Sequence, residues 1–157
     1  MHTMNLDKMN IRILNLLQLD ARKTVSDIAR ELNRAETTVR ERIKKMESEN
    51  IIMGYCAFVD KKAIGYGTEA LIFCNFDPEK MEPGIKKLLT MKHVISISHV
   101  TGQRRVVIHV ATKSNEEMWS FVHHTIIPVG GLDVDSHVIM RKYDKLPPDG
   151  IIEDELD

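Results

Sequence analysis

The spacing of apolar residues changes along this 157-residue chain, and that change constrains its fold more than any other feature. Over the first fifty residues they recur every three or four positions, the period of a helix with one buried face. Beyond residue 67, short runs of strand-forming residues alternate with helical segments. We therefore expect an α+β protein in which an all-helical domain precedes a mixed one.

Three short helices are predicted in the first fifty residues, from the apolar stripes Leu6–Leu17, Val25–Leu32 and Val39–Met46. Thr24 precedes the second stripe and has an acidic residue three positions on, which approximates a capping box. Asn33 follows it, and asparagine tolerates the left-handed conformation that ends many helices. Residues 1–50 are thus predicted to form a helix-turn-helix domain, winged-helix-like in outline.

The third predicted helix, residues 36–48, has a polar face opposite its apolar stripe when residues advance by 100° each. Arginine can bind guanine or phosphate, threonine can contact a thymine methyl group, and lysine can follow the backbone. A solvated helix face is the alternative interpretation, but the very short second helix favours DNA binding. The residues expected to contact double-stranded DNA are Arg34, Thr37, Thr38, Arg40, Glu41, Lys44 and Lys45.

Charge supports this division of the chain. Residues 1–50 carry a net charge of +2 and residues 51–157 a net charge of −3. The segment Arg34–Lys45 holds five basic residues against two acidic ones, and residues 146–157 form an acidic tail. A locally basic segment within a nearly neutral chain is suited to binding an anion.

Residues 51–67 are predicted to be a linker. Its first part, Ile51–Asp60, is rich in strand-forming residues and is expected to be an extended connecting strand. Gly65-Tyr66-Gly67 then provides a turn signal before the second domain.

The second domain, residues 68–145, is expected to follow the order strand-helix-strand-strand-helix-strand of a ferredoxin-like βαββαβ fold. The predicted elements are a strand at 70–76, a helix opened by Pro78 that buries Met81, Ile85, Leu88 and Leu89, strands at 94–100 and 105–111, a helix capped by Ser114, and a strand at 134–140.

One sheet face is expected to need a partner, because the helices of such a domain cover only the other face. Ile95, Ile97, Val106, Ile108 and Val110 make the central strands too apolar to remain hydrated on both sides. The open sheet face and the linker around residues 55–59 are therefore predicted to form a homodimer interface.

Composition argues against several other classes of protein. The longest uncharged apolar stretch, Ala70–Phe76, is far too short to cross a membrane, and no secretory signal is recognisable. Cys56 and Cys74 form no metal or disulfide pattern, so we expect a reducing cytoplasm. The histidines lack the spacing of zinc ligands, and no catalytic arrangement is found. We expect no metal, no cofactor and no enzymatic activity.

Several short motifs occur in order along the chain: Leu6-Asp7, Ile13-Leu14, Leu17-Gln18, Asp20-Ala21-Arg22, Ile28-Ala29, Leu32, Thr38-Val39-Arg40, Arg42-Ile43, Ile51–Tyr55, Gly65 and Thr101-Gly102. Together they resemble the Lrp/AsnC (feast/famine) transcriptional regulators up to about residue 145. The resemblance implies a sequence-specific DNA-binding regulator that is modulated by a small, amino-acid-like effector. It also implies dimers that can stack into tetramers or octamers.

The sequence departs from the family pattern in the turn before its third helix and, to a smaller extent, within its first helix. The turn reads Asn33-Arg34-Ala35, where the family usually has glycine, an aliphatic residue and a serine that caps the third helix. Losing that cap costs about 1 kcal/mol. Asn10 stands where the family often has aspartate, which is a smaller change.

A third departure concerns the effector. The resemblance places its pocket at Thr101, Gly102, Gln103 and Arg104, where dimers meet. The family commonly has aspartates after the Thr-Gly pair, whereas this chain continues with arginines. Gly102 allows a turn that presents backbone N–H groups, and Arg104 or Arg105 could hold a carboxylate. We therefore expect a carboxylate-bearing effector such as glutamate or a dicarboxylic acid; a plain hairpin turn is the alternative.

Three other functions are kept as alternatives. Sirohaem decarboxylases share this architecture, and residues 96–105 share histidine and arginine with them but lack their tyrosine. A metal-responsive regulator would need ligands that the scattered histidines do not clearly supply. An effector-binding or assembly module without DNA binding is disfavoured by the intact basic third helix.

Overall fold

The computed structural model describes residues 6–143 of the chain. Their contacts divide them into two compact units, one extending to Phe58 and the other comprising Val59–Lys142. Within the described part of the chain, no helix is long and apolar enough to cross a membrane. The predicted acidic tail, residues 146–157, lies outside the described residues.

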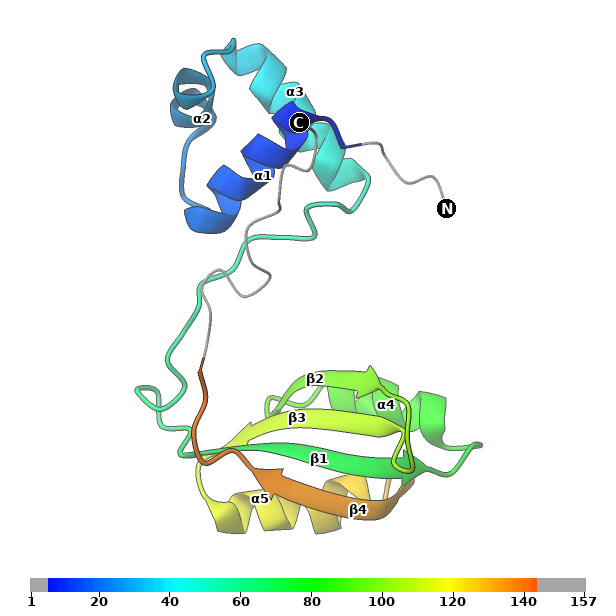
Figure 1. Cartoon of the computed structure of the whole chain (residues 1–157). Helices are drawn as coiled ribbons and strands as arrows, with labels where there is room; N and C mark the ends of the chain where they lie inside the picture. Colours follow the sequence, from blue (N-terminus) through cyan, green and yellow to red (C-terminus); the bar gives the residue numbers. More distant parts are fainter. Residues whose placement is uncertain (1–5, 144–157) are drawn as a thin grey trace. The chain divides into compact units, whose positions relative to one another are not determined.

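The first unit consists of the helices α1 (Lys8–Leu19), α2 (Val25–Glu31) and α3 (Glu36–Ser48) (Figure 1). Each contributes fully buried side chains to one core, including Ile13, Ile28, Val39 and Met46. The three predicted helices are confirmed, because an apolar stripe with helical spacing can be buried only where the helices meet.

Local signals set the ends of α2 as predicted. The hydroxyl of Thr24 accepts a hydrogen bond from the backbone N–H of Asp27 at 3.1 Å. Asn33 adopts the left-handed conformation, with φ of 51°. The N-cap of α3 is Ala35, and no side chain caps this end of the helix, which confirms the predicted loss of the cap.

The second unit is a four-stranded antiparallel sheet with strand order β2-β3-β1-β4, the ferredoxin-like arrangement. Its strands are β1 (Thr68–Phe76), β2 (Val94–His99), β3 (Val106–Thr112) and β4 (Gly131–Val138). Its helices are α4 (Met81–Leu89) and α5 (Asn115–Phe121), and a π-helical segment, η1 (Val122–Ile126), continues from α5.

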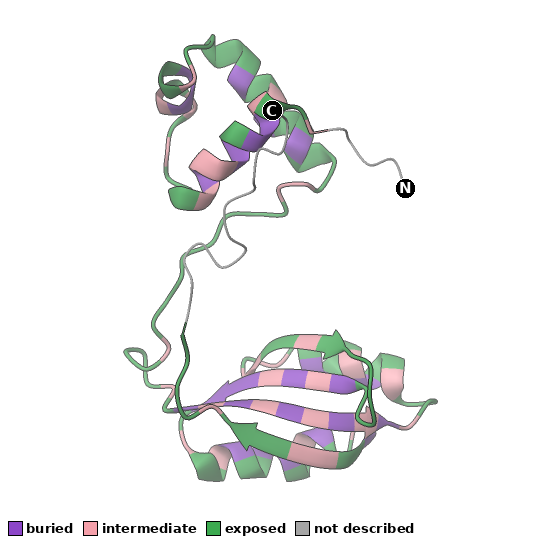
Figure 2. Cartoon of the chain, viewed as in Figure 1, coloured by how far each residue is buried: buried purple, intermediate pink, exposed green. Residues whose placement is uncertain are grey.

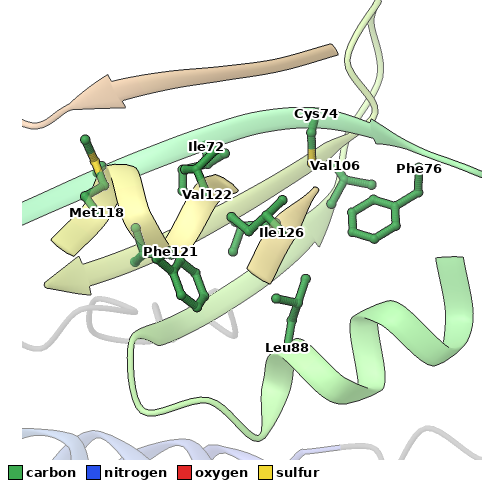
Figure 3. Close-up of a cluster of buried hydrophobic side chains, with 12 residues drawn as sticks. Ile72, Cys74, Phe76, Leu88, Val106, Met118, Phe121, Val122 and Ile126 are labelled. Carbon is green, nitrogen blue, oxygen red and sulfur yellow. The ribbon is translucent and has the colours of Figure 1, made fainter. Parts of the chain in front are cut away.

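The strand register assigns each side chain to a sheet face. Alternate residues of β1 are buried, and β3 pairs with β1 so that Ile72 lies opposite Ile108 (Figure 2). Ile72 and Val106 lie in the core with Leu88 of α4 and Phe121 of α5 (Figure 3). This face is the dry interior of the second unit.

The expectation that the apolar residues of β2 and β3 cover both faces is wrong for most of them. Val106, Ile108 and Val110 are fully buried beneath the helices, and Ile97 lies opposite Ile108 on the same face. The open face instead carries Leu71, Phe73 and Val107 among polar groups, because successive residues of a strand point to opposite faces and Phe73 pairs with Val107.

Two predicted boundaries are corrected. The helix expected from Pro78 begins at Met81, because residues 77–80 form a turn in which the carboxylate of Asp77 accepts the N–H of Glu79. Leu89 at its end is 57% exposed rather than buried. The last strand is β4, Gly131–Val138, rather than 134–140, so Met140 lies beyond it.

Gly131 begins β4. A Cβ at this position would lie 2.7 Å from the side chain of Ile126. The strand can therefore pass close to η1 only because glycine has no side chain.

The predicted connecting strand is not formed within the described chain. Residues 53–60 pair with no other strand, and Phe58 and Val59 are exposed by 64% and 56%. An extended segment without a neighbouring strand has no partner for its backbone hydrogen bonds. Tyr55 is nevertheless attached to the first unit, because its hydroxyl donates to a carboxylate oxygen of Glu47 at 2.9 Å.

Candidate DNA interface and effector-binding turn

The candidate DNA interface is the outer side of α3 with the turn before it. Val39, Ile43 and Met46 are buried and fix the rotation of this helix about its axis. The seven residues predicted to contact DNA are all exposed: Arg34, Thr37, Thr38, Arg40, Glu41, Lys44 and Lys45. The helix thus presents hydroxyls and cations to solvent on the side opposite its anchored face.

The cations of α3 are held only weakly within the protein. Arg40 lies 3.9 Å from Glu36, and Lys45 lies 3.9 Å from Glu49, each pair one helical turn apart. Exposed pairs of this kind contribute a few tenths of a kcal/mol. They can therefore exchange their carboxylates for phosphates at little cost.

Arg42 is a basic residue of α3 that belongs to the scaffold rather than to this interface. Its guanidinium donates to the carboxylate of Asp7 at 2.7 Å and to the side-chain oxygen of Asn10 at 2.8 Å. Asp7 also caps α1 by accepting the N–H of Asn10. The hydrogen bond from Arg42 is the main reason that the pKa of Asp7 lies below its usual value.

The Asp7–Arg42 contact was not expected from the sequence. The two residues are 35 positions apart, and each could equally be a solvated residue on a helix surface. The aspartate and arginine in the motifs Leu6-Asp7 and Arg42-Ile43 were the available signal. This ion pair joins the start of α1 to the middle of α3 and so orients the candidate recognition helix.

The candidate effector region is the turn between β2 and β3. Thr101, Gly102, Gln103 and Arg104 are all exposed, and Gly102 has a φ of 121°, which favours glycine. Arg104 is not an isolated cation. It donates to the backbone oxygen of Asp133 at 2.8 Å and lies 3.1 Å from the carboxylate of Asp135.

These contacts tie the turn to the far edge of the sheet. Asn75 of β1 accepts the N–H of Arg105 at 3.2 Å and donates to the carboxylate of Asp133 at 3.2 Å. His137 lies 3.2 Å from Asp135. Arg104 therefore has beside it a carboxylate of β4 that the loop sequence lacks.

The histidines of the second unit mostly have structural partners. His109 lies 2.5 Å from Glu69, and His93 lies 3.1 Å from Glu117. The Nδ1 atoms of His123 and His124 lie within hydrogen-bond distance of backbone oxygens one turn earlier. Within residues 6–143, no three side chains of the metal-binding types lie together.

A helix-turn-helix unit with an exposed polar recognition helix, joined to a ferredoxin-like unit, defines a transcriptional regulator with a ligand-binding domain. Residues 6–47 match the AsnC-type helix-turn-helix domain, and residues 69–148 match the Lrp/AsnC ligand binding domain. The chain belongs to the Lrp/AsnC family.

Named relatives support this assignment. The chain is 31% identical over 124 residues to the HTH-type transcriptional regulator Ptr1 of Methanocaldococcus jannaschii, covering 79% of this chain and 84% of the relative. It is 30% identical over 118 residues to the HTH-type transcriptional regulator FL11 of Pyrococcus abyssi, covering 75% and 78% of the two chains.

Solved structures show that the fold is shared. A transcriptional regulator of Neisseria meningitidis, solved in complex with L-Met, superposes with a TM-score of 0.83 at 21% identity, covering 90% of this chain and 94% of that one. LrpC of B. subtilis superposes with a TM-score of 0.81 at 22% identity, covering 90% and 99%.

Proposed function

We propose that this chain binds operator DNA sequence-specifically as a homodimer, with α3 of each subunit in a major groove. The observation that carries the proposal is the set of seven exposed polar residues on and before α3, opposite its buried stripe. In this role Arg34, Arg40, Lys44 and Lys45 contact phosphates or guanine. Thr37, Thr38 and Glu41 contact base edges.

The open sheet face and the linker supply the dimer contact in this proposal. Leu71, Phe73 and Val107 share the open face, and Phe58 and Val59 of the linker are exposed. Apolar side chains in these positions are stabilised by a second copy. A dimer presents two recognition helices, so its site is a pseudo-palindrome with half-sites about one helical turn, or a multiple, apart. Stacking of dimers into tetramers or octamers follows from the family rather than from any contact seen here.

The DNA proposal is tested with a fluorescent duplex taken from the chain's own upstream region. The Arg40/Lys44/Lys45→Ala variant is expected to bind every duplex more weakly and to flatten the salt dependence by about one unit per lost cation. A Lys80/Lys86/Lys87→Ala variant, which removes as many cations from the second unit, serves as the control. A folded α3 variant that binds as tightly as wild type contradicts the proposal.

The two threonines test specificity separately from affinity. Thr37→Ala or Thr38→Ala is expected to change the ranking of base-substituted duplexes and to leave the salt slope nearly unchanged. Equal losses on all duplexes would instead assign these hydroxyls to phosphates.

We also propose that the turn Thr101–Arg104 contributes to an effector site for a free amino acid. The turn can hold a carboxylate through its backbone N–H groups and an arginine, and Asp133 and Asp135 lie beside Arg104 to attract an ammonium group. This arrangement favours a zwitterion over the dicarboxylate expected from sequence. The N. meningitidis relative was solved with one such zwitterion, L-Met.

Isothermal titration with L-methionine, L-glutamate and succinate distinguishes these ligands. We expect L-methionine to bind, Arg104→Ala and Asp135→Asn each to weaken it, and succinate to bind least. Ligand binding is expected to change DNA affinity by about 5- to 150-fold. If succinate binds more tightly than L-methionine, the zwitterion proposal is wrong.

A further inference from the structure

The first unit contains a hollow between α1 and α2 that its DNA-binding role does not use. It has a volume of about 220 Å³ and is lined by Arg12, Asn15, Leu16, Glu31 and Leu32. We call this the α1–α2 hollow. None of its lining residues belongs to the predicted DNA contacts on α3.

The lining of the α1–α2 hollow combines apolar surface with one available cation. Leu16 and Leu32 are half-buried, so part of each side chain remains open to an occupant. The charge of Glu31 is compensated by an ion pair with Lys23. Arg12 is exposed and forms no ion pair with any other residue between 6 and 143. The hollow is therefore suited to a segment that carries both apolar and acidic side chains.

Residues 144–157 of the same chain have this composition. Six of these fourteen residues are acidic and one is a lysine, which gives a net charge of −5. The acidic residues surround the apolar residues Ile151, Ile152 and Leu156. Most of this segment also lies beyond the family domains, the second of which ends at residue 148.

The strand register places the end of β4 beside the start of β1. Val138 at the end of β4 pairs with Ala70 near the start of β1, and Ile139 donates its N–H to the backbone oxygen of Glu69 at 2.8 Å. The chain therefore leaves the sheet where the linker from the first unit enters it. The linker between α3 and β1 has nineteen residues, and residues 139–157 are as many, so the two segments have similar reach.

We propose that residues 144–157 bind the α1–α2 hollow of their own chain, with the isoleucines against Leu16 and Leu32 and the carboxylates against Arg12. A segment bound in the hollow leaves the predicted DNA contacts on α3 uncovered. This proposal does not depend on DNA or effector binding.

The test uses a fluorescent peptide of residues 144–157 and a full-length chain whose own segment is disabled. The disabling substitutions are Ile151→Ser, Ile152→Ser, Glu153→Gln, Asp154→Asn and Glu155→Gln, all outside the described units. We expect the peptide to bind this variant and to bind the wild-type chain at least about tenfold more weakly, because a tethered segment competes at an effective concentration near millimolar.

Charge reversal locates the peptide. Adding Arg12→Glu to the disabled chain is expected to weaken peptide binding about tenfold, whereas Arg22→Glu, an equal charge change on exposed surface outside the hollow, is expected to have little effect. A peptide with both Ile151→Ser and Ile152→Ser should bind weakly even to the disabled chain that keeps Arg12.

Three results overturn the proposal. One is the absence of peptide binding to the disabled chain at millimolar concentration. Another is equal binding to the disabled and wild-type chains. The third is binding that ignores Arg12→Glu and is lost in an Arg40/Lys44/Lys45→Ala background, because that result assigns the segment to α3.

Discussion

The recognition helix α3 and the β2–β3 turn both present arginines in sequence, but the structure uses them differently. On α3 the cation of Arg40 lies 3.9 Å from a carboxylate one turn away. In the turn, Arg104 is bound by two groups of β4, at 2.8 and 3.1 Å. A helix determines its exposed face locally, whereas the partners of a turn residue depend on which strand lies beside it.

The cores of the two units also differ in how far local spacing alone predicts which residues are buried. The buried stripe of α3 follows from spacing alone, because a helix has one period and one apolar side. The strands β1 and β3 have apolar residues on both faces. Only the strand register and the packing of the helices show which face is dry.

Adjacent residues of β3 provide the sharpest test of the two sheet faces. Ile108→Asp places a charge in the dry core and is expected to destabilise the second unit by about 4 kcal/mol or more. Val107→Asp lies on the open face and is expected to leave the unit folded but to weaken the dimer. Circular dichroism on heating measures the first effect, and sedimentation at micromolar concentration measures the second. If both variants unfold alike, the face assignment is wrong.

The Asp7–Arg42 pair tests whether α3 is oriented by α1. Arg42→Ala removes hydrogen bonds to Asp7 and Asn10 and is expected to destabilise the first unit by about 2 kcal/mol. Chemical denaturation monitored by circular dichroism provides the measurement. Arg40→Ala, which removes only a weak surface pair, is the control and should have an effect within about 0.5 kcal/mol.

The same pair predicts an acid dependence. The pKa of Asp7 is lower in the folded chain, so its contribution to stability is present above its ordinary value of 3.8 and is lost as the pH falls through the lower folded pKa. Urea titrations between about pH 5 and pH 2 should show a shallower loss in Arg42→Ala than in wild type. Identical pH slopes would show that Arg42 does not stabilise the Asp7 carboxylate.

Tyr55 tests the attachment of the linker to α3. Burial, and then the hydrogen bond to Glu47, raise the pKa of Tyr55 to about 12 from 10. A raised folded pKa means that this contribution is complete below pH 10 and is lost as the pH rises towards 12. Tyr55→Phe is expected to cost about 1 kcal/mol at pH 7. Ultraviolet absorbance measured against pH should show that the tyrosine ionisation near pH 12 disappears in this variant.

The smallest expected effect is a gain of stability. Ala35→Ser restores a side-chain cap to α3 and is expected to stabilise the first unit by about 1 kcal/mol. Ala35→Val, which supplies no side-chain acceptor, is the control and is expected to bring no gain. A serine variant no more stable than the valine variant would show that the N–H groups of α3 are already satisfied.

The sequence alone determined the features that depend on near neighbours. The three helices of the first unit, the cap at Thr24, the left-handed Asn33 and the exposed side of α3 all follow from interactions within about four residues. The order of elements in the second unit also follows, since each strand and helix has its own period. These features suffice to identify the family and to predict the recognition helix.

Only the tertiary structure decided which distant groups meet. It paired Asp7 with Arg42, brought Asp135 to Arg104, and placed Ile97 and Ile108 on the helix-covered face. In each case one residue has a side chain that could equally face solvent, and the register of a strand or the packing of a helix selects its partner. Pairing across tens of residues depends on the whole fold, so no local period in the sequence can encode it.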